Sequence, residues 1–232
     1  MGQASGKAFL PAAALFFYAL LPGQAQIAPS AAEVRAYAGL HAAAAGGDAS
    51  AIVRLADGDK KALEARDGNG RTPLHVAAFL KQRTAIATLI KAGANTAALD
   101  NQKYDAVTIA AVADDAETLR TLLENGASAK LTTSIYDGTA LIAAAHLGHD
   151  ECVRLLIKHG APLDHVNNLR WTASIEAVVL GNGGTRHQQT LRYLIEAGAN
   201  TKLADAAGKT PLDHARARGY VAMVRMLEAA RR

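Results

Sequence analysis

The sequence repeats one pattern at an interval of about 33 residues, and this periodicity restricts the chain to a small set of folds. The pattern is Leu or Ile, two further residues and then Gly-Ala, and its glycines are Gly93, Gly126, Gly160 and Gly198. These glycines lie 33, 34 and 38 residues apart. A second marker keeps the same phase, and its threonines are Thr72, Thr139, Thr172 and Thr210. Two markers in constant phase predict a solenoid of stacked supersecondary units.

The marker residues are of the types that begin and end helices. Thr72 can cap the first helix of a unit. Pro73 then lies in the first turn of that helix, where a missing N–H group costs nothing. Gly93 follows an apolar run, as expected of a residue that ends a second helix in the left-handed conformation. Alanine is abundant and aromatic residues make up only 5% of the chain, which favours close helix–helix packing over a β-sandwich. We therefore predict an all-α chain.

Residues 67–95, which contain Thr72-Pro73-Leu74-His75-Val76-Ala77-Ala78, resemble the ankyrin repeat nearly position for position. The resemblance covers about residues 38–232. It implies an ankyrin-repeat solenoid of about six helix-turn-helix units with short β-turn fingers. It also implies that His75 is a structural residue that holds its turn by hydrogen bonding. The expected repeats are about 38–66, 67–99, 100–133, 134–166, 167–204 and 205–232.

The terminal units are expected to differ from the inner ones, because each turns one face to water. Residues 26–37 form a lead-in and the start of a capping helix, in which Ser30 and Glu33 have the spacing of a capping box. The last unit carries Arg216 and Arg218 in place of repeat alanines, as a solvated cap would. In the fifth unit, glycines and polar residues over 181–189 predict a longer loop between the two helices.

Residues 1–25 have the pattern of a secretory signal peptide, with Lys7 followed by an uncharged apolar run over 8–21. This run of 14 residues is shorter than the roughly 20 that span a bilayer as a helix. The alternative is an N-terminal core helix, but such a helix normally has a polar face and this run has none. We predict cleavage after Ala25 and a location in the bacterial periplasm or beyond.

A narrower resemblance supports export. The stretches 104–111 and 164–172 look like those of signal-bearing proteobacterial ankyrin-repeat proteins, a group without a defined activity. Cys152 is the only cysteine, which excludes an intramolecular disulfide. After removal of residues 1–25 the chain holds 24 Lys and Arg against 21 Asp and Glu, a net charge of +3. This charge is too slight to indicate nucleic acid or membrane binding, and we expect a monomer without stable membrane insertion.

The sequence contains no Ser–His–Asp arrangement, P-loop or HExxH helix, so we expect neither enzymatic activity nor a cofactor. The glycines within 181–184 suggest a phosphate cradle, but they follow a helix instead of a strand and lack a following Lys-Ser/Thr. His146, His149 and Cys152 suggest a zinc or haem site through their spacing. A turn separates the two histidines, however, and structural zinc sites usually need four ligands. Periplasmic metal or haem handling through surface histidines is the alternative function.

The expected binding surface follows from the family resemblance. Ankyrin-family partners lie across the turn tips and the exposed positions of the first helices, which together form a concave face. Carried over to this sequence, the expected partner-binding residues are Arg71, Phe79, Leu80, Tyr104, Val112, Tyr136, His146, Leu147, Leu169, Trp171, Val179 and Leu180. Further turn-tip positions are Asn69, Asn101, Gln102, Ile135 and Lys209.

Two features favour a protein-binding function. Three of the seven aromatic residues after position 25, Tyr104, Tyr136 and Trp171, fall on the turns of three successive repeats. The helix positions are largely apolar, and an apolar stripe with aromatic anchors is typical of an interface centre. The alternative is that these rings pack against the next turn. We predict an exported, non-enzymatic module that binds a protein partner, for which a cell-envelope enzyme is one candidate.

Overall fold

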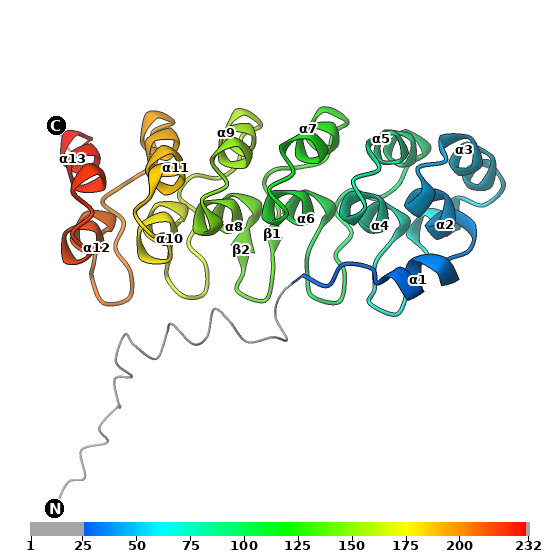
Figure 1. Cartoon of the computed structure of the whole chain (residues 1–232), viewed down its shortest axis with the longest axis horizontal. Helices are drawn as coiled ribbons and strands as arrows, with labels where there is room; N and C mark the ends of the chain where they lie inside the picture. The colour runs from blue at the N-terminus through cyan, green and yellow to red at the C-terminus, as the bar shows by residue number, and fades with distance from the viewer. Residues whose placement is uncertain (1–25, 231–232) are drawn as a thin grey trace, which may run out of the picture.

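The computed structural model describes residues 26–230, which form an elongated solenoid (Figure 1). Within these residues six helix pairs are stacked side by side, which confirms the prediction of an all-α solenoid of about six helix-turn-helix units. The pairs are α2 (Gly39–Gly46) with α3 (Ala49–Gly58), α4 (Pro73–Phe79) with α5 (Arg83–Ala92), α6 (Ala106–Val112) with α7 (Ala116–Glu124), α8 (Ala140–Leu147) with α9 (Asp150–Lys158), α10 (Ala173–Val179) with α11 (Thr185–Glu196), and α12 (Pro211–Ala217) with α13 (Val221–Ala229).

The first helices of the pairs form one row and the second helices form the other (Figure 1). Between successive pairs the chain projects as a finger beyond the row of first helices. We number each finger after the pair that follows it, so that fingers two to six comprise residues 66–71, 99–104, 132–138, 166–171 and 204–209. Finger four contains a hairpin of β1 (Thr132–Thr133) and β2 (Gly138–Thr139). Two short helices, α1 (Ala31–Ala36) and η2 (Lys60–Glu64), lie near the N-terminal end.

The helix ends have the caps that the sequence predicts. Thr72 is the N-cap of α4 and Pro73 is its first residue. His75 Nδ1 accepts a hydrogen bond from the Thr72 N–H at 3.1 Å, and His75 Nε2 lies 3.0 Å from the carbonyl oxygen of Tyr104 in the next finger. Burial lowers the pKa of His75, which suits a neutral, structural imidazole. Gly93 ends α5 with φ +105°, the left-handed conformation that glycine adopts at no steric cost.

Fully buried side chains from successive first helices form a continuous core. Leu74, Val107 and Leu141 occupy corresponding positions in α4, α6 and α8, and none is more than 1% exposed. The helix α8 packs against both α6 and α10, and its alanines allow the close approach that the composition predicts. A second, smaller cluster around Met223 closes the C-terminal end. The core therefore depends on contacts between neighbours, as in other solenoids.

Main-chain hydrogen bonds join the tips of fingers two to five. The N–H of Asn101 donates to the Asn69 carbonyl at 3.1 Å, and the N–H of Ser134 donates to the Lys103 carbonyl at 2.7 Å. Fingers four and five are joined in the same way, because the N–H of Asn168 donates to the carbonyl of Tyr136 at 3.0 Å. The fingertips therefore form one connected edge along the solenoid.

The predicted long loop over residues 181–189 is wrong in its second half. Only the residues between α10 and α11 form a turn, and α11 begins at Thr185. The N-terminal turn of α11 is held in place by His187, whose Nε2 lies 3.0 Å from the His146 carbonyl oxygen. The ring of His187 fits against Gly148 and Gly181, where an added Cβ would lie within 2.7 Å of it. The extra residues therefore lengthen a helix as well as a turn.

Residues 1–25, to which the predicted signal peptide belongs, lie outside the described residues. Within residues 26–230, no helix has both the length and the apolar character needed to cross a membrane.

Candidate protein-binding surface

The predicted binding residues differ widely in exposure. Leu147 and Leu169 are exposed, with 41% and 39% of their surface accessible, and the neighbouring tip residue Ile135 is 41% exposed. Eight others are half-buried: Phe79, Leu80, Tyr104, Val112, Tyr136, His146, Trp171 and Leu180. Arg71 and Val179 are buried. The accessible apolar side chains therefore lie mainly in the fourth and fifth units.

Exposed leucine and isoleucine side chains lie on the linked tips of fingers four and five. Ile135 belongs to finger four and Leu169 to finger five, and the Nδ2 of Asn168 donates to the Ile135 carbonyl at 3.1 Å. Leu147 is the last residue of α8, so it lies at the far end of this first helix from finger four. A hollow of about 260 Å³ adjoins Leu147 and is also lined by Arg186 and other residues of the lengthened α11 region. This surface therefore has protruding apolar side chains and, beside Leu147, a recess whose other lining residues are glycine and polar residues.

The prediction that Val179 is exposed is wrong, because the last pair covers it. The helix α12 packs against α10, and Val179 retains only 8% exposure. Arg218, expected as part of a solvated cap, is half-buried and donates from Nη2 to the Val179 carbonyl at 3.0 Å. Arg216 is exposed and pairs with Glu228, so of these two arginines only Arg216 is solvated as expected.

Tyr104 supports the packing interpretation of the finger aromatics. Its ring is half-buried and packs against the main core cluster. Burial raises the pKa of its hydroxyl. Its main-chain carbonyl oxygen lies 3.0 Å from Nε2 of His75 in the preceding unit. Tyr104 therefore helps to stack the third unit on the second.

Glu176 is a buried charged residue that the sequence reasoning missed. It lies in α10 with 5% exposure, where the corresponding residues of α4 and α6 are Val76 and Ile109. Its Oε1 accepts a hydrogen bond from Asn167 Nδ2 at 2.8 Å, and its Oε2 lies 3.3 Å from His146 Nδ1. A charge at a repeat position that is apolar in α4, α6 and α8 is the sequence pattern that could have revealed it.

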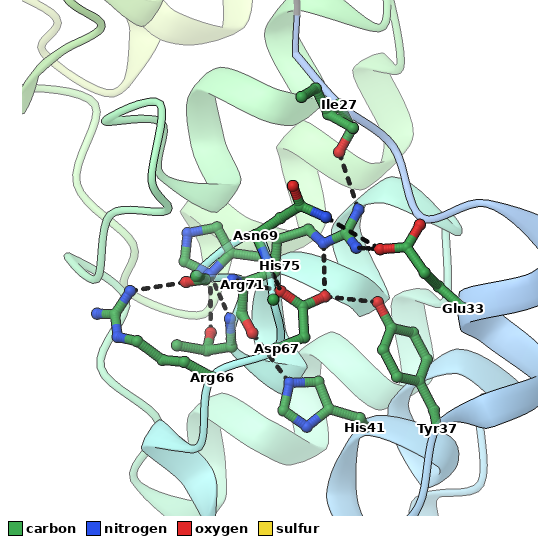
Figure 2. Close-up of polar contacts among 12 residues, drawn as sticks. Ile27, Glu33, Tyr37, His41, Arg66, Asp67, Asn69, Arg71 and His75 are labelled. Carbon is green, nitrogen blue, oxygen red and sulfur yellow. Dashed lines mark hydrogen bonds and ion pairs between the residues drawn. The ribbon is translucent and has the colours of Figure 1, made fainter.

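The prediction that Arg71 lies on an accessible turn tip is also wrong. Its side chain is fully buried by residues 26–37, which we call the strap and which cross fingers two and three (Figure 2). Arg71 Nε donates to Asp67 Oδ2 at 2.6 Å, its Nη1 donates to the Ile27 carbonyl at 3.0 Å, and its Nη2 pairs with Glu33. Tyr37 donates its hydroxyl to Asp67 at 2.7 Å. The capping box of Ser30 and Glu33 is present as predicted.

The strap contacts shift the pKa values of its acidic groups. Hydrogen bonds from Ser30 lower the pKa of Glu33, and Arg71 lowers it further. Burial would raise the pKa of Asp67, but hydrogen bonds from Tyr37 and Arg71 outweigh it and hold this pKa below its usual value. Burial and the bond to Asp67 raise the pKa of Tyr37. At neutral pH the strap is therefore held by two carboxylates, a neutral phenol and a guanidinium.

His146, His149 and Cys152, the residues whose spacing suggested a metal site, each have other contacts in the structure. His149 Nδ1 lies 2.9 Å from the Ala111 carbonyl oxygen, and His146 faces Glu176. Cys152 is fully buried, and burial raises the pKa of its thiol to about 12. Across the described part of the chain, no three His, Cys, Asp or Glu side chains are grouped so that they could hold a metal ion. Nothing in the structure therefore supports metal or haem handling.

Comparisons with known proteins identify the repeats. A family model described as ankyrin repeats in three copies matches residues 40–133 and 107–205. The chain is 33% identical over 165 residues to the ankyrin repeat protein YahD of Escherichia coli, a match that spans 71% of this chain and 82% of that protein. It spans between 16% and 49% of the length of seven other curated relatives. The activities of those longer proteins are therefore not assigned to this chain.

Solved structures show the same fold. A crystal structure of an ankyrin repeat domain from Acinetobacter baumannii AYE is 44% identical, with a TM-score of 0.75 over 82% of this chain and 96% of that chain. A chain in the complex of a predatory endopeptidase from Bdellovibrio bacteriovorus with its immunity protein is 23% identical, with a TM-score of 0.66 over 83% of this chain and 98% of that chain. The second likeness shows the fold alone.

Proposed function

The chain belongs to the ankyrin-repeat family, a family of protein-interaction modules, and from that premise we propose that it is a non-enzymatic module whose partner protein binds across repeats four and five. The observation that carries the proposal is the pair of exposed apolar side chains Ile135 and Leu169 on neighbouring, hydrogen-bonded fingertips. Leu147 extends this surface to the other end of α8.

Three physical properties favour a protein interface at this surface. Exposed leucine and isoleucine side chains gain free energy when a partner removes them from water. The half-buried rings of Tyr136 and Trp171 lie on the same two fingers, and aromatic side chains often dominate the binding energy of interfaces. The fingertip hydrogen bonds fix the spacing of the apolar side chains before a partner binds, which lowers the entropic cost of association.

Affinity capture from a cell-envelope extract, followed by mass spectrometry, tests this proposal. The test variant carries Ile135→Glu and Leu169→Glu, which place charges on the fingertips. The matched control carries Val53→Glu and Val221→Glu, two side chains that are 59% and 60% exposed outside this surface. A partner that is retained by the wild-type and control chains and lost by the test variant supports the proposal. Equal retention by all three chains contradicts it.

Export is a further part of the proposal, and it rests on the sequence of residues 1–25. N-terminal sequencing of protein from the periplasmic fraction should find a chain that begins at Gln26. Recovery of the chain with Met1 intact from the cytoplasm would contradict export without affecting the binding surface. An exported binding module meets enzymes of the cell envelope, and such an enzyme, inhibited or chaperoned, is the partner class that we propose.

A further inference from the structure

The strap binds fingers two and three as a ligand would. It reaches finger three through Ile27, whose N–H donates to Gln102 Oε1 at 3.1 Å. The carbonyl of the same residue accepts from Arg71 Nη1 at 3.0 Å, so both main-chain polar groups of Ile27 are held by finger side chains. The N-terminal part of the strap, before α1, has no helical or sheet structure, and it lies along the edge of the fingers in Figures 1 and 2.

The groups around Arg71 define the chemistry of the surface beneath the strap. The carboxylate of Glu33 pairs with Arg71 Nη2 and accepts from Asn69 Nδ2 at 3.0 Å. Finger two therefore presents a guanidinium and an amide to one carboxylate, and the guanidinium also binds a main-chain carbonyl. Arginine is well suited to this combination, because its planar fork of donors matches carboxylate geometry.

Arg71 is buried from two sides, by its own finger through Asp67 and by the strap through Ile27 and Glu33. At the corresponding position of the other fingers, Tyr104 and Trp171 are half-buried and Lys209 is exposed. Removal of the strap would leave the guanidinium with Asp67 alone. Because the strap covers Arg71, its removal would also expose the guanidinium to water and open the site to a carboxylate from another chain.

We propose that the strap is an intramolecular ligand on a carboxylate-binding site formed by Arg71 and Asn69, and that an extended acidic segment of the partner binds there by displacing it. This inference rests on the proposed function in one respect, namely that the ligand in trans is a protein. It adds a second contact region to the one on repeats four and five. The covalent link through Ala38 gives the strap a high effective concentration, so the site is closed until a partner is anchored nearby.

The first experiment cleaves the peptide chain between the strap and the solenoid in the folded protein. A protease recognition sequence is inserted between Tyr37 and Ala38 of the full chain, the chain is cleaved after purification, and circular dichroism checks that the solenoid is retained. A fluorescent peptide with the sequence of residues 26–37 is then added. We expect saturable exchange of this peptide into the cleaved protein, and at least about tenfold weaker binding of the same peptide with Glu33→Ala. Equal binding of the two peptides, or no exchange, would overturn the proposal.

The second experiment uses the uncut chain and needs no partner. Glu33→Ala should raise hydrogen exchange at the strap amides at least about tenfold, and it should expose Arg71 to an arginine-specific reagent. Ser30→Ala, which removes the cap of α1 but keeps Glu33, should have a smaller effect. Glu117→Ala, at an exposed ion pair with Arg120, is the matched control and should have none. A strap that remains protected in Glu33→Ala would overturn the proposal even if cleavage unfolds the chain. Neither experiment depends on capture of a partner, so failure here and failure of the proposed function are distinguishable.

Discussion

Arg186 of the fifth unit donates two hydrogen bonds to the carboxylate of Asp114 in the third unit, at 2.7 and 2.9 Å. The Nε of Arg186 also donates to Asp150 in the fourth unit, at 2.8 Å. Asp114 has a φ of +53° at the position where the next unit has Gly148, a conformation that costs a non-glycine residue roughly 1–2 kcal/mol. One arginine therefore connects three units, and its partner carboxylate occupies a strained turn position.

We expect Arg186→Ala to lower the free energy of unfolding by about 1 kcal/mol, because Arg186 joins a network of exposed charges and not a single pair. Asp114→Gly should lower it less, since glycine relieves the left-handed strain while the ion pair is lost. Urea denaturation measures both changes. The control is Arg154→Ala, which removes an exposed pair with Glu151 within one helix. A loss in the control equal to that in Arg186→Ala would show that the connection between units contributes nothing.

Leu141→Ala should destabilise the fold by roughly 2–5 kcal/mol, because a fully buried leucine leaves a cavity between neighbouring helices. Since α8 packs against α6 and α10, the change should also weaken coupling between units and broaden or split the thermal transition. Differential scanning calorimetry measures both effects. Ile135→Ala, at an exposed fingertip, is the control and should melt as the wild type does. An unchanged melting curve for Leu141→Ala would contradict the packing described above.

Acid should release the strap before it unfolds the solenoid. The lowered pKa values of Glu33 and Asp67 mean that these carboxylates stabilise the strap above the ordinary carboxyl range of about 4. That contribution is lost as the pH falls through their lowered folded-state values. Amide NMR shifts of residues 26–37 should therefore change with a midpoint below about 4, while the Leu141 amide keeps its native shift. A strap midpoint above about 5 would contradict this assignment.

Trp171→Ala separates binding from packing at finger five. If the ring belongs to the interface, the change should weaken the partner complex by at least about 2 kcal/mol and leave the melting temperature nearly unchanged. Tyr104→Ala is the comparison, because Tyr104 packs against the core and should lower the melting temperature. Isothermal titration with the captured partner and thermal melts measure the two effects. A large fall in melting temperature with unchanged affinity would make Trp171 a packing residue.

The inner repeats were predictable because each is specified by local rules. The Thr72-Pro73 start and the Gly93 end fix a helix pair through capping and backbone conformation, and the same rules recur at the threonines and glycines of later units. The positions of core residues such as Leu141 then follow from the phase of the repeat. No long-range information is needed to place them, since the core of each unit is packed against the helices of its immediate neighbours.

The strap and the lengthened helix were not predictable from the same rules. Glu33 already had a role in the capping box, so its second role as a partner of Arg71 left no separate pattern in the sequence. The contact of Ile27 with Gln102 joins residues 75 positions apart, and no periodicity relates them. The glycines within 181–184 favoured a loop, yet the contacts of Arg186 and His187 with earlier units stabilise these two residues as part of a helix.

The most direct test of the binding surface is site-specific photo-crosslinking in living cells of the natural host. A photoreactive phenylalanine analogue is placed at position 169 on finger five and, in a separate chain, at position 221, where the native Val221 is 60% exposed outside this surface. We predict that position 169 yields one discrete protein adduct, that Ile135→Glu in the same chain abolishes this adduct, and that position 221 yields none. Adducts of equal yield from the two positions, or none from position 169, would contradict the assignment of the interface to fingers four and five.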